Sequence, residues 1–142
     1  MTYKFLEHTA DIKFTAEHNE IEGMFADAAR ALNKTITKDL DGKEINSNIN
    51  KSIEIYGNDL ESLLRNFLEE FLYLLDAEDF LASNIDKRYL EIDKKNFKLK
   101  AIIKGDKASN YKFTNDVKAI TYNEMFVRHD KNKWQCQVVI DV

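Results

Sequence analysis

Proline is absent from the 142-residue sequence, glycine occurs four times and cysteine only once. Because residues that break or loosen the chain are so scarce, no linker is evident, and we predict one domain over residues 1–142. The single cysteine, Cys136, cannot form an internal disulfide. Together with the lack of an apolar secretory segment near residue 1, this favours a reducing, cytoplasmic location.

An excess of positive charge is also missing, since the formal net charge is −4 and the pI is about 5.4. Proteins that hold nucleic acid by themselves generally present a basic face, because neutralising phosphates supplies much of the affinity. We therefore expect any RNA to be held by a partner. No stretch approaches the ~18 consecutive apolar residues of a membrane-spanning helix, so no membrane association is expected.

Helical spacing of apolar residues predicts two amphipathic helices, over residues 19–33 and 58–75. Capping boxes are predicted at their starts, from Asn19 with Glu22 and from Asn58 with Glu61. Residues 78–82 are interpreted as a short extra turn. Period-two alternation predicts strands over residues 3–6, 12–17, 52–57, 89–93, 97–103, 117–127 and 134–142. This order predicts an α+β fold: a mostly antiparallel sheet with two main helices packed on one face.

Nucleophilic and zinc chemistry find little support in the sequence. Cys136 alternates within an apolar strand and is expected to be buried, and only His8 is left open as a histidine partner for it. His18 and His129 are interpreted as surface groups. No Cys-x-x-Cys or His-Glu-x-x-His spacing occurs.

Oxygen ligands for a hard cation are the better candidates. The chain ends Val-Val-Ile-Asp-Val, so Asp141 and the carboxylate of Val142 lie one residue apart. Such a pair suits Ca²⁺, Mg²⁺ or Mn²⁺, and Asp11 could add a third ligand if the last strand passes it. The alternative, which the pattern alone favours, is a solvated acid at a fraying end.

Lys118 shares a predicted strand face with Ile120 and Tyr122. A lysine in such a place is commonly a solvent-facing residue at the edge of a sheet, with its stem over apolar surface. It could equally present its charge to a phosphate or to the acids.

The sequence resembles the archease family across nearly its whole length. The matching segments, in family order, are Glu-His-Thr-Ala-Asp-Ile at 7–12, Phe-Ala-Asp-Ala-Ala-Arg-Ala-Leu at 25–32, Asp-Leu-Glu-Ser-Leu-Leu at 59–64, Val-Lys-Ala-Ile-Thr-Tyr at 117–122 and Val-Ile-Asp-Val at 139–142. The resemblance implies a small α+β protein that is not itself an enzyme. It implies an activator of the RtcB-type RNA ligase of tRNA splicing, which promotes ligase guanylation and multiple turnover.

By the family pattern, a divalent metal (calcium, magnesium or manganese) is held by Asp11, Asp141 and Val142. Lys118 falls at a position that the family also uses, as a contact to a partner or a phosphate. His8 and Glu7 become supporting residues around the ligands. Many relatives have histidine where this chain has Asn123, so no role is carried over to that position.

Two other classes of function remain open at this point. One is a stand-alone metal-dependent phosphoesterase that acts on RNA ends, with His8 as its base. The other is a general chaperone or adaptor, for which the aspartates would be dispensable and an exposed apolar patch would matter.

Overall fold

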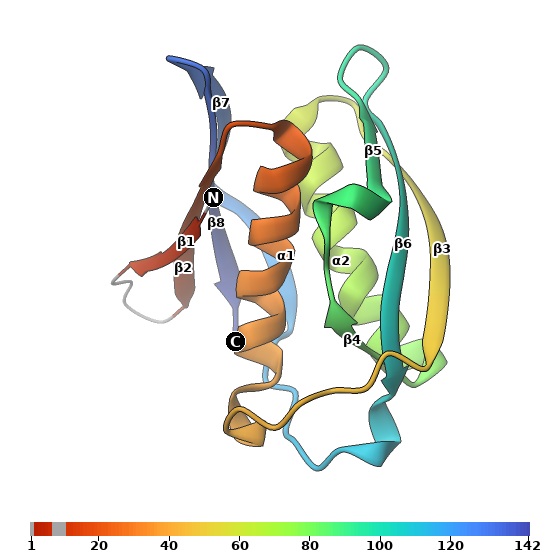
Figure 1. Ribbon diagram of the computed structural model, residues 1–142. Coiled ribbons are helices and arrows are strands. Elements are labelled where there is room, and N and C mark those ends of the chain that lie inside the picture. The colour runs from red at the N-terminus through yellow and green to blue at the C-terminus, as the bar shows by residue number, and fades with distance from the viewer. Residues whose placement is uncertain (1, 7–10) are drawn as a thin grey trace.

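Two antiparallel sheets enclose a layer of two α-helices in the computed structural model, which describes residues 2–6 and 11–142 (Figure 1). The helices are α1 (Ile21–Ile36) and α2 (Leu60–Glu78). The predicted α+β class is confirmed, and the helices lie against one face of each sheet. The division into two sheets was not predicted, because alternation shows only that a strand has one buried face.

The first sheet has the strand order β1-β2-β8-β7, so the last strand lies inside it. Its strands are β1 (Thr2–Leu6), β2 (Ile12–His18), β7 (Ala119–Asp130) and β8 (Lys133–Asp141). Both neighbours of β8 run antiparallel to it. Segments from the two ends of the chain therefore meet in one sheet.

The second sheet is built around β6 (Lys98–Lys107), which pairs with every other strand in it. The other strands are β3 (Ile49–Tyr56), β4 (Phe80–Asn84) and β5 (Leu90–Asp93). Short 3₁₀ turns occur at Lys38–Leu40, Lys87–Tyr89 and Ala108–Asn110. The backbones of β4 and β6 approach closely at Gly105, where a Cβ atom would come within 2.2 Å of the Leu81 carbonyl oxygen.

Helix α1 is buried on almost all sides, as expected for a helix placed between two sheets. Small side chains let the neighbouring elements pack closely on α1. Four alanines of this helix have no exposed surface: Ala26, Ala28, Ala29 and Ala31. At the first turn the His18 ring covers Gly23, where a Cβ atom would come within 2.3 Å of the imidazole.

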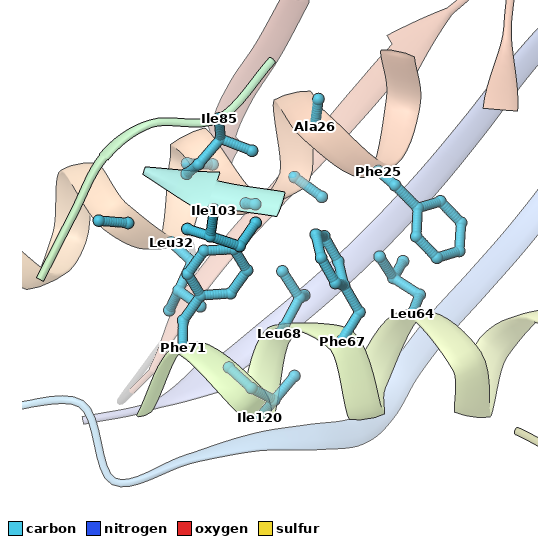
Figure 2. Close-up of a cluster of buried hydrophobic side chains, with 14 of the residues drawn as sticks. Phe25, Ala26, Leu32, Leu64, Phe67, Leu68, Phe71, Ile85, Ile103 and Ile120 are labelled. Carbon is cyan, nitrogen blue, oxygen red and sulfur yellow. The ribbon is translucent and has the colours of Figure 1, made fainter. Parts of the chain in front are cut away.

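Helix α2 supplies the aromatic centre of the core. Phe67 has no exposed surface and contacts Phe71 edge-on, with ring centroids 5.2 Å apart. Figure 2 shows Phe25 and Leu32 of α1 on the side of α2 that carries Phe67 and Leu68, while Ile120 lies on the other side of α2. The leucine and phenylalanine stripe predicted from the sequence is thus core.

Three local predictions were wrong. Helix α1 begins after Glu20, with no side-chain cap, in place of the predicted Asn19 and Glu22 box. The capping box of α2 is formed by Asp59 and Ser62, because Ser62 both donates its N–H to the Asp59 carboxylate at 2.7 Å and accepts the Asp59 N–H. The predicted turn at 78–82 is the end of α2 followed by β4, whose Phe80, Leu81 and Ala82 are buried.

Candidate functional site

The start of β2 and the end of β8 meet at one corner of the first sheet. Ile12 pairs with Ile140, and continuing this antiparallel register by one residue sets Asp11 opposite Asp141. We call Asp11, Asp141 and Val142 the acidic corner. All three residues are half-buried, and the Val142 side chain packs against the core.

Asp141 faces away from the helices. Phe14 and Val138, which pair with each other, and Ile140 have no exposed surface on the helix side of the sheet. Because successive strand residues point to opposite faces, Asp141 points to the outer face. Directly opposed residues of an antiparallel pair have Cβ atoms about 5 Å apart, a separation that two carboxylates and one cation can share.

Lys118 is joined to the acidic corner through its backbone. Its N–H donates to the Asp141 carbonyl oxygen at 2.8 Å. Lys118 is exposed, and it lines a hollow of about 390 Å³ together with Glu69, Glu70 and Asp76 of α2. Burial, and then the charge of Glu78, raise the pKa of Glu70. The structure thus sets Lys118 beside acids of α2.

Two side chains of α2 hold the beginning of β7. The Glu69 carboxylate accepts the Ile120 N–H at 2.9 Å, and the Arg65 Nε donates to the Ile120 carbonyl oxygen at 3.2 Å. The two side chains also form an ion pair of 3.3 Å. The position of Lys118 relative to Asp141 therefore depends on α2, a relationship that no local pattern in the sequence reveals.

A wide bulge in β7 brings a further carboxylate to the outer face. Thr121 pairs with Val139 and Phe126 with Gln137, so residues 122–125 stand opposite Val138 alone. Glu124 has a left-handed φ of 54° and its carboxylate lies 3.4 Å from the Nζ of Lys13. Its carbonyl oxygen accepts from the Gln137 side chain at 2.8 Å. Sequence reasoning missed Glu124, because a bulge is not visible in period-two alternation.

Asn123 lies in the same bulge. It is exposed, and its N–H donates to the Thr121 hydroxyl at 3.3 Å. This contact joins the Asn123 backbone to the Thr121 side chain within the bulge.

A large hollow, of about 1160 Å³, borders the acidic corner. It lies between the β1–β2 edge, the end of α1 and the loop that follows α1, and Asp11 is part of its lining. Cationic side chains from the helix and the loop also line it: Arg30, Lys34, Lys38 and Lys43. Arg30 and Lys38 are paired with Asp27 and Asp116, which moderates the charge of the hollow.

The remaining candidate groups lie elsewhere. Cys136 is buried among core residues, as predicted, and burial raises the pKa of its thiol to about 12, so it is neutral and shielded. His18 and His129 belong to the opposite end of the sheet. Glu7 and His8 lie outside the described residues. Over residues 2–6 and 11–142 no three His, Cys, Asp or Glu side chains gather as a metal cluster.

Comparison with known proteins defines the class. The model of the Archease protein family matches residues 3–142. The archease of Methanosarcina mazei is 31% identical over 142 residues, which cover 99% of this chain and 95% of the relative. The archease of Pyrobaculum neutrophilum is 34% identical over 143 residues, with 99% and 95% covered. The chain belongs to the archease family.

Solved structures agree with this assignment. The solution structure of Methanobacterium thermoautotrophicum protein 1598 matches with a TM-score of 0.79 and 27% identity, covering 99% of this chain and 98% of that one. A Thermotoga maritima structure, described as an archease and possible chaperone, has a TM-score of 0.59 at 17% identity and covers 98% and 96%. The latter likeness shows the fold alone. Among the described helices none is long and apolar enough to cross a membrane.

Proposed function

We propose that this archease activates an RtcB-type RNA ligase of tRNA splicing and holds a divalent metal ion at Asp11, Asp141 and Val142. The observation that carries the proposal is the register of β2 and β8, whose continuation by one residue sets Asp11 opposite Asp141 at one corner of the first sheet. In this proposal the chain has no catalytic residue, and tRNA is reached through the ligase.

The donor set fits a hard cation. Two carboxylates and an oxygen of Val142 are the ligands that Ca²⁺, Mg²⁺ and Mn²⁺ prefer, and the corner contains no thiol among the described residues. Two partly buried carboxylates repel each other unless a cation lies between them. When bound, the ion would supply positive charge at a tip that is otherwise acidic.

The chain's own residues would position this tip. Asp141 pairs with Ala119 of β7, the preceding Ile140 pairs with Ile12 of β2, and the Lys118 N–H donates to the Asp141 carbonyl oxygen, so the backbone that carries the carboxylate is fixed. Pre-organised ligands bind with a smaller loss of entropy. The net charge of −4 favours approach to a basic, RNA-binding ligase. An acidic corner docked at the ligase's metal-containing centre would promote guanylation.

The test is a reconstituted ligation with RNA in excess over the ligase, with and without this protein. Wild-type protein should convert single-turnover ligation to multiple turnover, and Asp11→Asn or Asp141→Asn should abolish this gain. Glu91→Gln is the matched control, since Glu91 is an exposed acid on the second sheet. Full activation by both aspartate variants would overturn the role of the corner.

Two further measurements separate the alternatives. If the pure protein with a divalent metal opened cyclic-phosphate RNA ends in the absence of ligase, the stand-alone phosphoesterase would replace this proposal. A general chaperone would protect unrelated proteins as well as the ligase, with the aspartates dispensable.

A further inference from the structure

The end of the β7–β8 hairpin that is remote from the acidic corner carries a stacked pair of rings. His129 and Trp134 are cross-strand partners, with ring centroids 4.3 Å apart and planes only 2° from parallel. Trp134, the only tryptophan of the sequence, is half-buried, while His129 is exposed. The imidazole therefore lies flat on the indole and presents its other face outward.

Cationic groups lie on both faces of the sheet at this end of the hairpin. The turn segment contains three basic side chains, Arg128, Lys131 and Lys133, and one acidic side chain, Asp130. The Nζ of Lys94, from the β5–β6 turn, lies 5.6 Å from the centre of the Trp134 ring. Lys133 is paired with Glu17 at 3.2 Å.

On the opposite face of the sheet from the stack, a small hollow of about 190 Å³ adjoins the turn, and Arg128, Lys131 and Lys133 line it together with Glu17 and Asp130. The hairpin end thus has a local positive excess on a chain with a net charge of −4.

We propose that this end of the hairpin binds single-stranded nucleic acid. A base would stack on the outward face of His129, continuing the His129–Trp134 stack. Adjacent phosphates would contact Lys94 on the same side of the sheet and, by passing around the exposed edge of β7, Arg128 and Lys131 on the other side. Flat ring faces beside cations are the combination by which proteins hold unpaired bases and their backbone. An acidic peptide would use the cations but would gain nothing from the stack, which is why a nucleic acid is the better fit.

The hairpin end is far enough from the acidic corner for the acids not to oppose binding of phosphates. Lys133 and Asp141 lie at opposite ends of β8, and eight residue steps of about 3.3 Å place them about 26 Å apart. This exceeds the Debye length of about 8 Å at physiological salt, so the acidic corner does not repel phosphates at the hairpin end. The proposal thus adds a direct RNA contact to a protein for which only an indirect one was expected, and it holds whether or not the ligase is the partner.

The experiment uses the isolated protein and no ligase. A fluorescently labelled, unstructured oligouridylate is titrated at low salt, with anisotropy for affinity and Trp134 emission as the site-specific signal. Wild-type protein should bind with quenching of the tryptophan. His129→Ala should weaken binding about tenfold, because one base stack contributes roughly 1–3 kcal/mol. His129→Phe should retain most of the affinity.

A double variant, Arg128→Ala with Lys131→Ala, tests the phosphate contacts. It should reduce the slope of log Kd against the logarithm of the salt concentration by about 1.4, because each phosphate contact on a single strand contributes roughly 0.7 to that slope. Lys38→Ala is the matched control, because Lys38 is an exposed cation on the loop after α1. Circular dichroism checks that each variant is folded.

Three results would overturn the proposal: no binding at low salt, equal binding by His129→Ala and wild type, or displacement of the oligonucleotide by oligoglutamate as readily as by unlabelled RNA. The last would reduce the hairpin end to a general cationic patch. Parallel titrations with oligodeoxyuridylate and with duplex RNA identify the ligand class, and the proposal requires the single strand to bind more tightly than the duplex.

Discussion

The Glu69 carboxylate of α2 accepts the backbone N–H of Ile120 in β7 at 2.9 Å. Ile120 is buried and β7 is an edge strand, so this contact satisfies a donor that has no second neighbouring strand. Arg65 completes the arrangement from the same helix by donating to the Ile120 carbonyl oxygen. An edge strand is thus fastened to a helix at the point where it approaches the acidic corner.

Glu69→Ala should lower the free energy of unfolding by roughly 1–2 kcal/mol, because the Ile120 N–H loses its partner in a partly buried place. Glu69→Gln should cost less, since the amide oxygen still accepts and the half-exposed ion pair with Arg65 contributes little. Urea denaturation of the three proteins measures the difference. Equal stability of the two variants would show that the hydrogen bond contributes nothing.

Phe67→Ala should destabilise the domain by about 3–5 kcal/mol, because it removes a fully buried ring from the middle of the helix layer. The Phe67 ring packs against the rings of Phe71 and Phe25, with centroid separations of 5.2 Å and 5.9 Å. The control is Tyr73→Ala on the exposed side of the same helix, where 56% of the residue is accessible. Thermal melts should separate the two variants clearly, and a similar destabilisation in both would place Phe67 outside the core.

Tyr111→Phe should produce a pH-dependent loss of stability. The Tyr111 hydroxyl donates to the Asp106 carboxylate at 2.8 Å and accepts the Asn46 N–H at 2.9 Å. The hydrogen bond from Tyr111 is the main reason why the pKa of Asp106 lies below its ordinary value. A carboxyl group whose pKa is lowered by folding stabilises the fold at pH values above its unfolded-state pKa. This stabilisation is lost as the pH falls through the folded-state pKa.

The stability difference between wild type and Tyr111→Phe should therefore be largest near neutral pH and should shrink below about pH 4, the ordinary value for aspartate. Urea denaturation across the acidic range measures it. Asp106→Asn in the same series is the control, because it removes the titrating group. A difference that stays constant with pH would mean that Tyr111 acts through packing alone.

Divalent metal should stabilise the wild-type protein through the acidic corner. A ligand that binds only the folded state adds about 2.7 kcal/mol when its concentration is a hundred times Kd. The melting temperature should rise with added CaCl₂ or MnCl₂ and fall back with chelator, and Asp141→Asn should abolish the response. Glu91→Gln should respond like wild type. Equal shifts in wild type and Asp141→Asn would place the ion elsewhere.

Sequence reasoning predicted the parts of this fold that depend on periodicity. The stripe of α2 and the strands on either side of the β5–β6 turn follow directly from residue spacing, and burial of Cys136 follows from its place in an apolar strand. The pairing of β2 with β8 could be suggested only as the condition under which Asp11 would approach Asp141. The structure meets that condition in the strand register.

Features that arise from contacts distant in sequence could not be predicted in this way. Glu124 reaches Lys13 only because four residues of β7 bulge away from the ladder. His129 was interpreted as a solvated group in a charged turn, since nothing local shows that Trp134 lies directly across the strand pair. The place of Lys118 against α2 likewise depends on a helix some fifty residues earlier in the chain.

The interior place of β8 in the first sheet bears on how the protein is made. Synthesis proceeds from the N-terminus, so β1, β2 and α1 leave the ribosome long before the strand that joins β2 to β7 exists. The strands of the second sheet occupy residues 49–107 and can pair among themselves first. Until β8 emerges, the side of α1 that will face the first sheet has no complete cover. Nascent chains of this protein therefore pass through an interval in which one side of the helix layer is incompletely covered, and the acidic corner is among the last features to form.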